Sequence, residues 1–373
     1  MKIGLLTIHD ALNYGAIFQT YATQEIFSRY GEVEIINYQN PHIKKSYATL
    51  NVKFSSRFLK DIIREFCLLK SKISKKEKFN CFFEKYYSMT DKTNLHEINN
   101  NLYDIYVCGS DQIWNSKVTN GNCLINEDYF LKFAPEGAKK ISYASSLGNH
   151  RFDVLHIDVI RKLLDRFDFI SMREKDGAEY LEQILSREVT QVLDPTLLLS
   201  KDEWIKKLNL EEKSYLDDYI LVYTVPRSDL LKDVVCYYSK TGVNVISVDS
   251  NLMKIHGVNR QIRDASPTEL LNLILNAKMV ITDSFHGVCF SINFRKDFLA
   301  ISSGELSNRM ENILNLVGME NRFIQSLSDI EKLKNVKSED YNISMQLLEE
   351  HKKESLNFIS RAFQGKRMKV VDI

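Results

Sequence analysis

One histidine follows a predicted strand directly, at the start of a predicted helix. His286 comes after the predicted strand 278–284 and is flanked by Ser284 and Gly287. A helix N-terminus offers free backbone N–H groups to an anion, and a glycine lets the backbone approach it closely. An imidazole can also carry a proton near neutral pH. A lone histidine is more often a capping or core residue, but the Asp-Ser-Phe-His-Gly context at a strand end favours an anion site here.

Several other loops of the sequence combine polar residues with the same position after an apolar strand. In open α/β sheets, ligands bind beyond the carboxyl ends of the strands. Six such loops are more than chain connection requires, so they predict a cleft equipped for chemistry. The loops are 9–15, 109–115, 142–148, 171–177, 282–287 and 302–309.

The elements that must position these loops alternate between strands and helices. Residues 3–8, a helical pattern from about 16 to 30 and residues 33–37 form one βαβ unit. The alternation continues in two series, which predicts two doubly wound, Rossmann-like α/β domains facing each other across a cleft. Further strands are predicted at 105–109, 139–146, 167–174, 188–195, 218–225, 243–248, 278–284 and 297–302, and helices at 228–240, 267–277, 287–294, 306–317 and 340–363.

The domain boundaries follow from the same alternation. Residues 1–200 are predicted to form an N-terminal α/β domain with a Lys-rich helical insertion at about 42–101. Residues 201–340 are predicted to form a C-terminal α/β domain. A C-terminal helix at 341–373 is predicted to pack back on the N-terminal domain.

Composition excludes several classes of protein. The 373 residues carry 50 Lys and Arg against 49 Asp and Glu, a net charge of +1, which argues against bulk binding of nucleic acid. No run approaches the roughly 18 apolar residues of a membrane span, and the N-terminus is a poor secretory signal. The six cysteines form no CxxC pair, so a cytoplasmic protein without disulfides or structural zinc is expected. No metal site, cofactor or nucleotide-binding glycine motif is predicted.

Seven short motifs extend over nearly the whole chain outside the insertion. They are T-x-H-x-A-L-N-Y-G-A (7–16), Y-V-C-G-S-D-Q-I-W-N (106–115), I-S-Y-A-S-S-L-G (141–148), S-M-R-E-K-D-G (171–177), L-D-P-T-L-L-L (193–199), T-D-S-F-H-G (282–287) and S-N-R-x-x-N-I-L (307–314). In this order they resemble the polysaccharide pyruvyl transferase family.

The resemblance implies a fold similar to that of GT-B glycosyltransferases and a phosphoenolpyruvate-dependent transfer. Family members move the enolpyruvyl group onto a sugar of a surface polysaccharide, an exopolysaccharide or capsule, or onto its precursor. A cyclic pyruvate ketal forms and phosphate leaves. No cofactor is implied beyond phosphoenolpyruvate as co-substrate. We expect a glycan acceptor, with an undecaprenyl-linked glycan as one candidate, and an enzyme in the cytoplasm or peripheral at the inner face of the membrane. Whether the chain forms a homo-oligomer stays open.

Phosphoenolpyruvate carries a carboxylate and a phosphate, so its site needs cationic donors and an acid. His286 is predicted to bind the phosphate and to act as general acid, with Ser284 and Gly287 beside it. The resemblance implies donor contacts for Arg173 and Arg309. Rivals for Arg309 are Arg295 and Lys296, and the alternative for Arg173 is a surface salt bridge with Glu174 or Asp176.

The general base is less determined, because Ala16 stands where some family members have an acidic residue. Asp10, Asp111 and His9 are candidates. Asp111 is preferred, since it follows a strand and faces the predicted cleft, although an Asp there can simply shape an Asx-turn.

Four further residues are predicted to position the acceptor sugar together with Asp10: Asn13, Tyr14, Gln112 and Trp114. An indole can stack on a pyranose face, but a tryptophan is more often core. For Asp283, the sequence is equally consistent with capping the following helix and with a catalytic role.

The segment 53–78 is basic and has apolar residues at helical spacing. The ordinary interpretation is a helix whose apolar face packs on the domain while its lysines are solvated. The alternative is a membrane-surface contact for a lipid-linked acceptor.

Two other functions compete with pyruvyl transfer. A GT-B-type glycosyltransferase with a nucleotide-sugar donor would use the same fold and needs a base-and-ribose pocket. A non-catalytic sugar-binding or assembly subunit would not bring His286 and Arg173 together.

Overall fold

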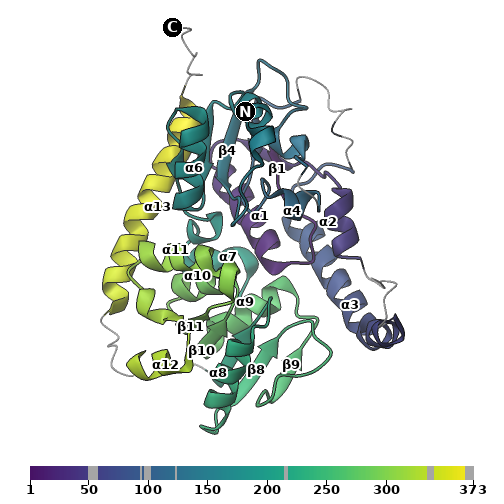
Figure 1. Cartoon of the computed structure of the whole chain (residues 1–373), viewed down its shortest axis with the longest axis vertical. Helices are drawn as coiled ribbons and strands as arrows, with labels where there is room; N and C mark the ends of the chain where they lie inside the picture. The colour runs from purple at the N-terminus through teal and green to yellow at the C-terminus, as the bar shows by residue number, and fades with distance from the viewer. Residues whose placement is uncertain are drawn as a thin grey trace. The chain divides into compact units, whose positions relative to one another are not determined.

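The computed structural model describes residues 1–48, 58–92, 95, 102–121, 124–213, 217–333 and 340–365. The chain divides into two compact units (Figure 1). The first unit combines residues 1–46, 86–198 and 349–373, and the second combines 47–85 and 199–348. The chain therefore crosses between the units four times, after residues 46, 85, 198 and 348.

The first unit contains a six-stranded sheet in the order β2-β1-β3-β4-β5-β6, and its strands pair in parallel. Its central strands are buried, as expected for a parallel sheet covered by helices. The strands are β1 (Lys2–Leu6), β2 (Glu32–Ile35), β3 (Ile105–Cys108), β4 (Lys139–Ser145), β5 (Phe169–Met172) and β6 (Thr190–Gln191). The helices are α1 (Tyr14–Phe27), α2 (Pro41–Ser46), α4 (Ser116–Thr119), α5 (Ile157–Leu164), α6 (Lys175–Leu185) and the later part of α13 (Asp340–Gln364).

The second unit contains another six-stranded parallel sheet, in the order β12-β11-β10-β7-β8-β9. Its strands are β7 (Asp217–Tyr223), β8 (Asn244–Val248), β9 (Arg260–Ile262), β10 (Ala277–Thr282), β11 (Asp297–Ile301) and β12 (Phe323–Ile324). Its helices are α3 (Phe58–Tyr86), α7 (Lys201–Leu208), α8 (Asp229–Ser239), α9 (Pro267–Asn276), α10 (Phe285–Asn293), α11 (Asn308–Leu316) and α12 (Leu327–Leu333). The predicted fold class, two doubly wound α/β sheets, is confirmed.

Capping residues fix where several of these helices begin. Ser266 caps α9, Pro267 occupies its first turn, and Glu269 completes a capping box, as the Ser-Pro pair predicts. Ser200 and Glu203 form the same box at α7, inside a stretch that the sequence analysis leaves without structure. A capping box satisfies N–H groups that would otherwise lack partners at the helix end.

Two short edge strands were not predicted, and one predicted strand is mostly absent. β9 and β12 have three and two residues, too few to show an alternating pattern. The strand expected at 188–195 is reduced to Thr190–Gln191. Asp194 instead accepts hydrogen bonds from the backbone N–H and the hydroxyl of Thr196, which starts a 3-10 turn at Pro195.

Helix α3 belongs to the second unit, which corrects the prediction of an insertion in the first domain. Ser74 Oγ donates to Asp264 Oδ2 at 2.6 Å, and Lys78 Nζ lies 3.2 Å from Glu269 Oε2. These bonds join α3 to the segment between β9 and α9 and to the first turn of α9. Residues 49–57, 93–94 and 96–101 of the predicted insertion lie outside the described residues.

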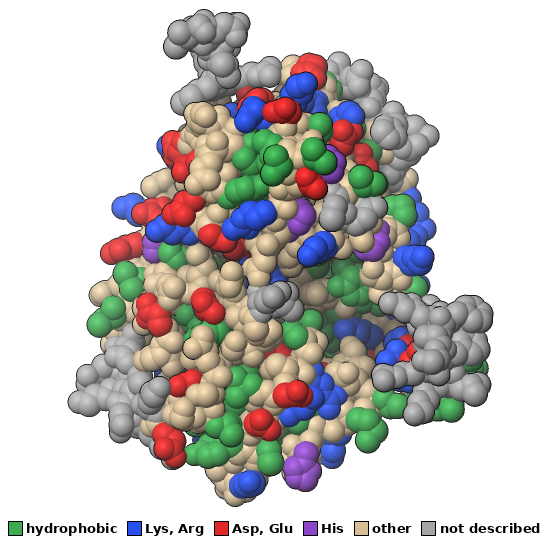
Figure 2. All heavy atoms as spheres, viewed as in Figure 1, with side chains coloured by type: hydrophobic (Ala, Val, Ile, Leu, Met, Phe, Trp, Pro, Cys, Tyr) green, Lys and Arg blue, Asp and Glu red, His purple; other side chains and the backbone are tan. Residues whose placement is uncertain are grey.

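None of the described helices combines the length and the apolarity that crossing a bilayer requires. On the face drawn in Figure 2, basic and acidic side chains are interspersed. This mixture agrees with the near-zero net charge.

Candidate active site

His286 lies in the first turn of α10, directly beyond the carboxyl end of strand β10. Ser284 is the N-cap residue, and its hydroxyl accepts the Gly287 N–H at 3.5 Å. The imidazole is only 7% exposed and meets the Phe285 ring edge-on, at 5.1 Å between centroids. The predicted placement of His286 at a helix N-terminus is therefore what the structure shows.

The absence of a side chain at Gly287 has a packing reason, and the predicted donor contact of Gly287 stays a prediction. A Cβ at this position would lie 2.3 Å from Thr282 Oγ1 and 3.0 Å from a Tyr223 ring carbon. Thr282 is fixed, because its hydroxyl donates to the Tyr223 carbonyl. Because residue 287 has no side chain, α10 can pack closely on strands β10 and β7.

Arg309 lies in the first turn of α11 and reaches the same aromatic ring as His286. Its guanidinium carbon is 5.7 Å from the centroid of Phe285. Strands β10 and β11 are neighbours, so the loops carrying His286 and Arg309 leave the same edge of the sheet. The Phe285 ring therefore contacts both the imidazole of His286 and the guanidinium of Arg309.

The two rivals of Arg309 lie at the other end of α10. Arg295 and Lys296 follow Phe294, the C-cap residue of this helix. Lys296 is buried, its ammonium donates to the Leu275 carbonyl at 3.1 Å, and burial lowers its pKa to about 8. Geometry within this unit therefore favours Arg309 as the cation near His286.

Asp283 acts neither as the cap of α10 nor as a free carboxylate. It accepts hydrogen bonds from the Thr224 hydroxyl and from the backbone N–H groups of Val225, Arg227 and Ser228. Burial raises the pKa of Asp283, and these hydrogen bonds oppose the shift. The carboxylate organises the loop that follows β7.

In the first unit, Arg173 is enclosed by carboxylates. Its Nε donates to Glu174 Oε1 at 3.0 Å and its Nη1 to Asp194 Oδ2 at 2.9 Å, while Nη2 lies 3.9 Å from Asp111 Oδ1. The side chain is 3% exposed. Burial lowers the pKa of Arg173, but the three carboxylates outweigh burial and the net shift is upward.

The surroundings of Arg173 do not suit an anionic donor. One guanidinium faces three carboxylates, so the formal charge of the group is −2. Ser146 Oγ also donates to Glu174 Oε1 at 2.8 Å. The expected alternative, a salt bridge with Glu174, is present, although it is buried; Asp176 pairs instead with Arg151 at 2.7 Å.

Asp111 is held in a backbone conformation that few residues adopt. Its φ is 72°, in the left-handed region that Asp and Asn tolerate best. Oδ1 accepts the Gln112 N–H at 2.9 Å, and its backbone pairs with Ser145. The side chain is 16% exposed. Asp111 therefore shapes its loop, as predicted for an Asx-turn residue. Part of its carboxylate is still exposed to solvent.

The first loop uses its polar side chains to hold itself in place. Asn13 caps α1, accepting the N–H groups of Gly15 and Ala16 at 2.9 and 3.4 Å. His9 is 1% exposed, and its ring nitrogens lie 3.2 Å from the Thr7 carbonyl and from Asn37 Oδ1. These partners argue against His9 as the base.

Tyr14 is 5% exposed in the first turn of α1 and Asp10 is half-buried. Gln112 Oε1 accepts from Asn115 Nδ2 at 2.8 Å, which ties the two ends of its loop. Sugar contacts by Asp10, Asn13, Tyr14 and Gln112 stay predictions.

Trp114 is a core residue, which corrects its prediction as a stacking platform. The indole is 1% exposed, donates its N–H to the Tyr129 carbonyl at 3.0 Å and stacks on Phe130 with 5.3 Å between centroids. A sugar can stack on an indole only where one face of the ring is exposed, and this indole has no exposed face. The sequence signal for burial was the apolar Ile113 beside it.

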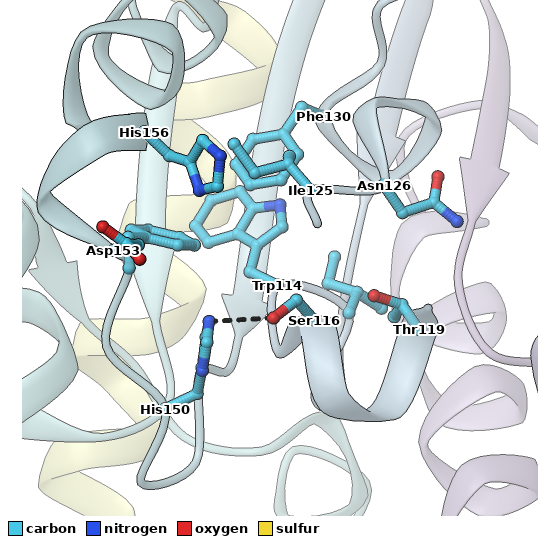
Figure 3. Close-up of a pocket in the computed structure, with 11 residues that line it drawn as sticks. Trp114, Ser116, Thr119, Ile125, Asn126, Phe130, His150, Asp153 and His156 are labelled. Carbon is cyan, nitrogen blue, oxygen red and sulfur yellow. Dashed lines mark hydrogen bonds between the residues drawn. The ribbon is translucent and has the colours of Figure 1, made fainter. Parts of the chain in front are cut away.

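Trp114 nevertheless lines a small pocket of about 280 Å³, part of it open to solvent. Figure 3 shows the Ser116 hydroxyl pointing at His150, and the Oγ–Nε2 distance is 3.1 Å. Burial, followed by Lys117 and Arg151, lowers the pKa of His150. The pair of Ser116 and His150 was not predicted, since neither residue lies in one of the seven motifs.

The predicted site residues thus form two groups, one in each unit. The group in the second unit consists of Ser284, His286 and Arg309, which follow strands β10 and β11. The group in the first unit consists of Asp111 and Arg173, which follow strands β3 and β5. Convergence of the two groups stays a prediction. Among the described residues, no three His, Cys, Asp or Glu side chains are grouped to hold a metal ion.

Comparison with known proteins adds a family and a fold. A family model for polysaccharide pyruvyl transferase matches residues 13–305. A search of curated proteins gives no significant match.

Two solved structures share the fold at low identity. An alpha-glucosyltransferase in complex with UDP and a 13-mer DNA has a TM-score of 0.51 at 10% identity, covering 96% of this chain and 99% of that one. The UDP complex of MnaA from S. aureus has a TM-score of 0.50 at 12% identity, covering 100% and 99%. These likenesses establish a GT-B-like architecture.

Proposed function

The chain belongs to the polysaccharide pyruvyl transferase family, and we propose that it moves the enolpyruvyl group of phosphoenolpyruvate onto a sugar of a surface polysaccharide or its lipid-linked precursor. The product is a cyclic pyruvate ketal, and inorganic phosphate is released. One observation carries the proposal: His286 and Arg309 both contact Phe285 at the edge where β10 and β11 end.

His286 binds the phosphate and protonates the methylene carbon of phosphoenolpyruvate. Protonation leaves an electron-poor carbon at C2, which a sugar hydroxyl attacks while a base takes its proton. A second hydroxyl then attacks C2, the bond between C2 and the phosphate oxygen breaks, and the departing phosphate takes the proton of that hydroxyl, so the donor and acceptor lose only inorganic phosphate. A helix N-terminus and a guanidinium favour this anionic leaving group.

Asp111 is the base in this proposal, and Arg173 positions it. The −2 charge around Arg173 would repel a phosphorylated acid but suits removal of a proton from a neutral hydroxyl. We therefore place the donor against the second unit and the acceptor against the first.

The decisive assay measures phosphate release from phosphoenolpyruvate with a panel of lipid-linked oligosaccharides. Release that requires both substrates, with pyruvate retained on the glycan, supports the proposal. Release of UDP from a UDP-sugar instead would establish the glycosyltransferase alternative. Absence of both with every acceptor would favour a non-catalytic sugar-binding subunit.

Arg309→Ala is expected to raise the KM for phosphoenolpyruvate by roughly 10- to 100-fold, the effect of one charge-assisted hydrogen bond. The KM for the acceptor should stay unchanged. Arg295→Ala is the matched control, since this exposed arginine lies beyond the other end of α10. Equal donor KM values in the two variants would remove Arg309 from the site.

Asp111→Asn is expected to lower kcat about 10²- to 10⁴-fold, the usual contribution of a general base, and to leave the donor KM unchanged. Asparagine also tolerates a φ of 72° and keeps an acceptor for the Gln112 N–H. Asp176→Asn, at an exposed ion pair, serves as control. If kcat of Asp111→Asn stays within a factor of a few of the unmodified enzyme, another group is the base.

A further inference from the structure

Helix α3, the long helix labelled in Figure 1, exposes apolar residues that the ordinary interpretation would bury. Ile63, Phe66 and Ile73 are 62%, 73% and 43% exposed. At about 100° per residue, these three and the exposed Lys70 fall on one side of the helix. We call Ile63, Phe66, Lys70 and Ile73 the outer face of α3.

The side of α3 opposite the outer face is buried at Leu68, Phe79 and Phe82. Ser74 and Lys78 lie nearer the outer face than these residues and bond the second unit just before α9 and in the first turn of α9. The packing of α3 on the second unit therefore leaves the outer face exposed and available to a binding partner. Exposed apolar residues grouped in this way mark interaction surfaces.

Charge indicates which partner fits. The helix carries eight basic residues (Lys60, Arg64, Lys70, Lys72, Lys75, Lys76, Lys78 and Lys85) against four acidic ones (Asp61, Glu65, Glu77 and Glu84), 8 − 4 = +4. Lys70 and Lys76 are exposed, and neither forms an ion pair within the part of the chain that the structure describes. Glu65 is neutralised internally, since Lys72 and Arg64 lie 2.5 and 3.6 Å from its carboxylate.

We propose that the outer face of α3 docks on the surface of an anionic lipid bilayer. Apolar side chains on a basic amphipathic helix enter the headgroup region while its lysines bind anionic lipid. The apolar part ends at Ile73, because the same side continues with Glu77, Asn80 and Glu84, which are exposed. Contact is thus made by the first half of the helix, and α3 lies on the bilayer.

A second copy of this chain is a poorer occupant. A symmetric dimer through this face would place each Lys70 near the basic residues of its partner, and like charges at an interface are unfavourable. The inference uses none of the residues of the proposed reaction site and stands whether or not pyruvyl transfer is correct. With a lipid-linked acceptor, it also explains how enzyme and substrate meet.

Vesicle co-sedimentation at low salt tests the proposal on the full chain. Binding to phosphatidylglycerol-containing vesicles but not to pure phosphatidylcholine vesicles is expected. The double variant Ile63→Ser/Phe66→Ser should bind at least about tenfold more weakly, because each large apolar side chain contributes about that factor when removed from water. Lys70→Glu should lose about fivefold or more, the effect of one charge near an anionic surface.

Leu155→Ser is the matched control, since Leu155 is 86% exposed on a short turn of the first unit. It should bind like the unmodified protein. Failure of the unmodified protein to bind anionic vesicles, equal binding by all variants, or a dimer that the double variant abolishes would each overturn the proposal. Phosphate release with a water-soluble acceptor should be unchanged in the double variant, which separates this test from that of the proposed reaction.

Discussion

Arg173→Ala is expected to lower the free energy of unfolding of the first unit by about 3–5 kcal/mol, the cost of removing one partner from a buried ion pair. The substitution leaves Glu174 and Asp194 buried without their guanidinium, and both side chains are at most 4% exposed. Urea unfolding measures the change. Arg173→Lys should recover only part of it, because an ammonium cannot donate to both carboxylates in the geometry of the fork.

Arg151→Ala is the matched control for this arginine. It breaks an ion pair of similar length with Asp176, but both partners are exposed to solvent by 39% and 48%. Exposed pairs contribute about 0–1 kcal/mol. A stable Arg173→Ala protein with a strongly raised KM for phosphoenolpyruvate would contradict the structural role and restore Arg173 as a donor ligand.

His286→Gln is expected to lower kcat at least about 100-fold, the lower range for loss of a general acid, while the protein stays folded. Glutamine keeps polarity and approximate size next to Phe285 and removes the proton that moves in the reaction. Phosphate release under saturating substrates, with circular dichroism as a check on folding, measures the effect.

His256→Gln provides the control for His286. His256 is exposed in the loop between β8 and β9, so its loss should not change turnover. A pH profile adds a second readout, because the limb that reports the acid should disappear from His286→Gln. Turnover near that of the unmodified enzyme would exclude His286 from catalysis and would remove the main support of the proposed function.

The sequence predicts the strands and helices well where hydrophobic pattern and turn chemistry agree. Strand β10 contains the apolar run Met279–Ile281 and is followed by Asp283 and Ser284, and α9 begins at a Ser-Pro pair. The unit to which α3 belongs could not be predicted, because the bonds of Ser74 and Lys78 join residues about 190 positions apart. Likewise, period alone does not tell which apolar side of a helix is buried, and Phe66 proves to be exposed.

The candidate site was predictable in position but not in electrostatics. His286 and Arg309 follow strands that the pattern identifies, so their shared edge follows from parallel topology. The partners of Arg173 come from three separate segments, at Asp111, Glu174 and Asp194. No spacing in the sequence predicts that these three carboxylates meet around Arg173.

The order of the segments along the chain affects the order in which the two units can fold during translation. The Leu193 N–H donates to Ser355 Oγ at 2.9 Å, and the Phe363 ring packs on Phe27 and Tyr30 with 5.0 Å between centroids in each pair. Multidomain proteins usually complete their N-terminal domain first during translation. Here the first unit needs residues as late as Phe363 to complete its core, whereas the second unit needs none beyond Leu348, so the unit that begins later in the chain can be completed earlier.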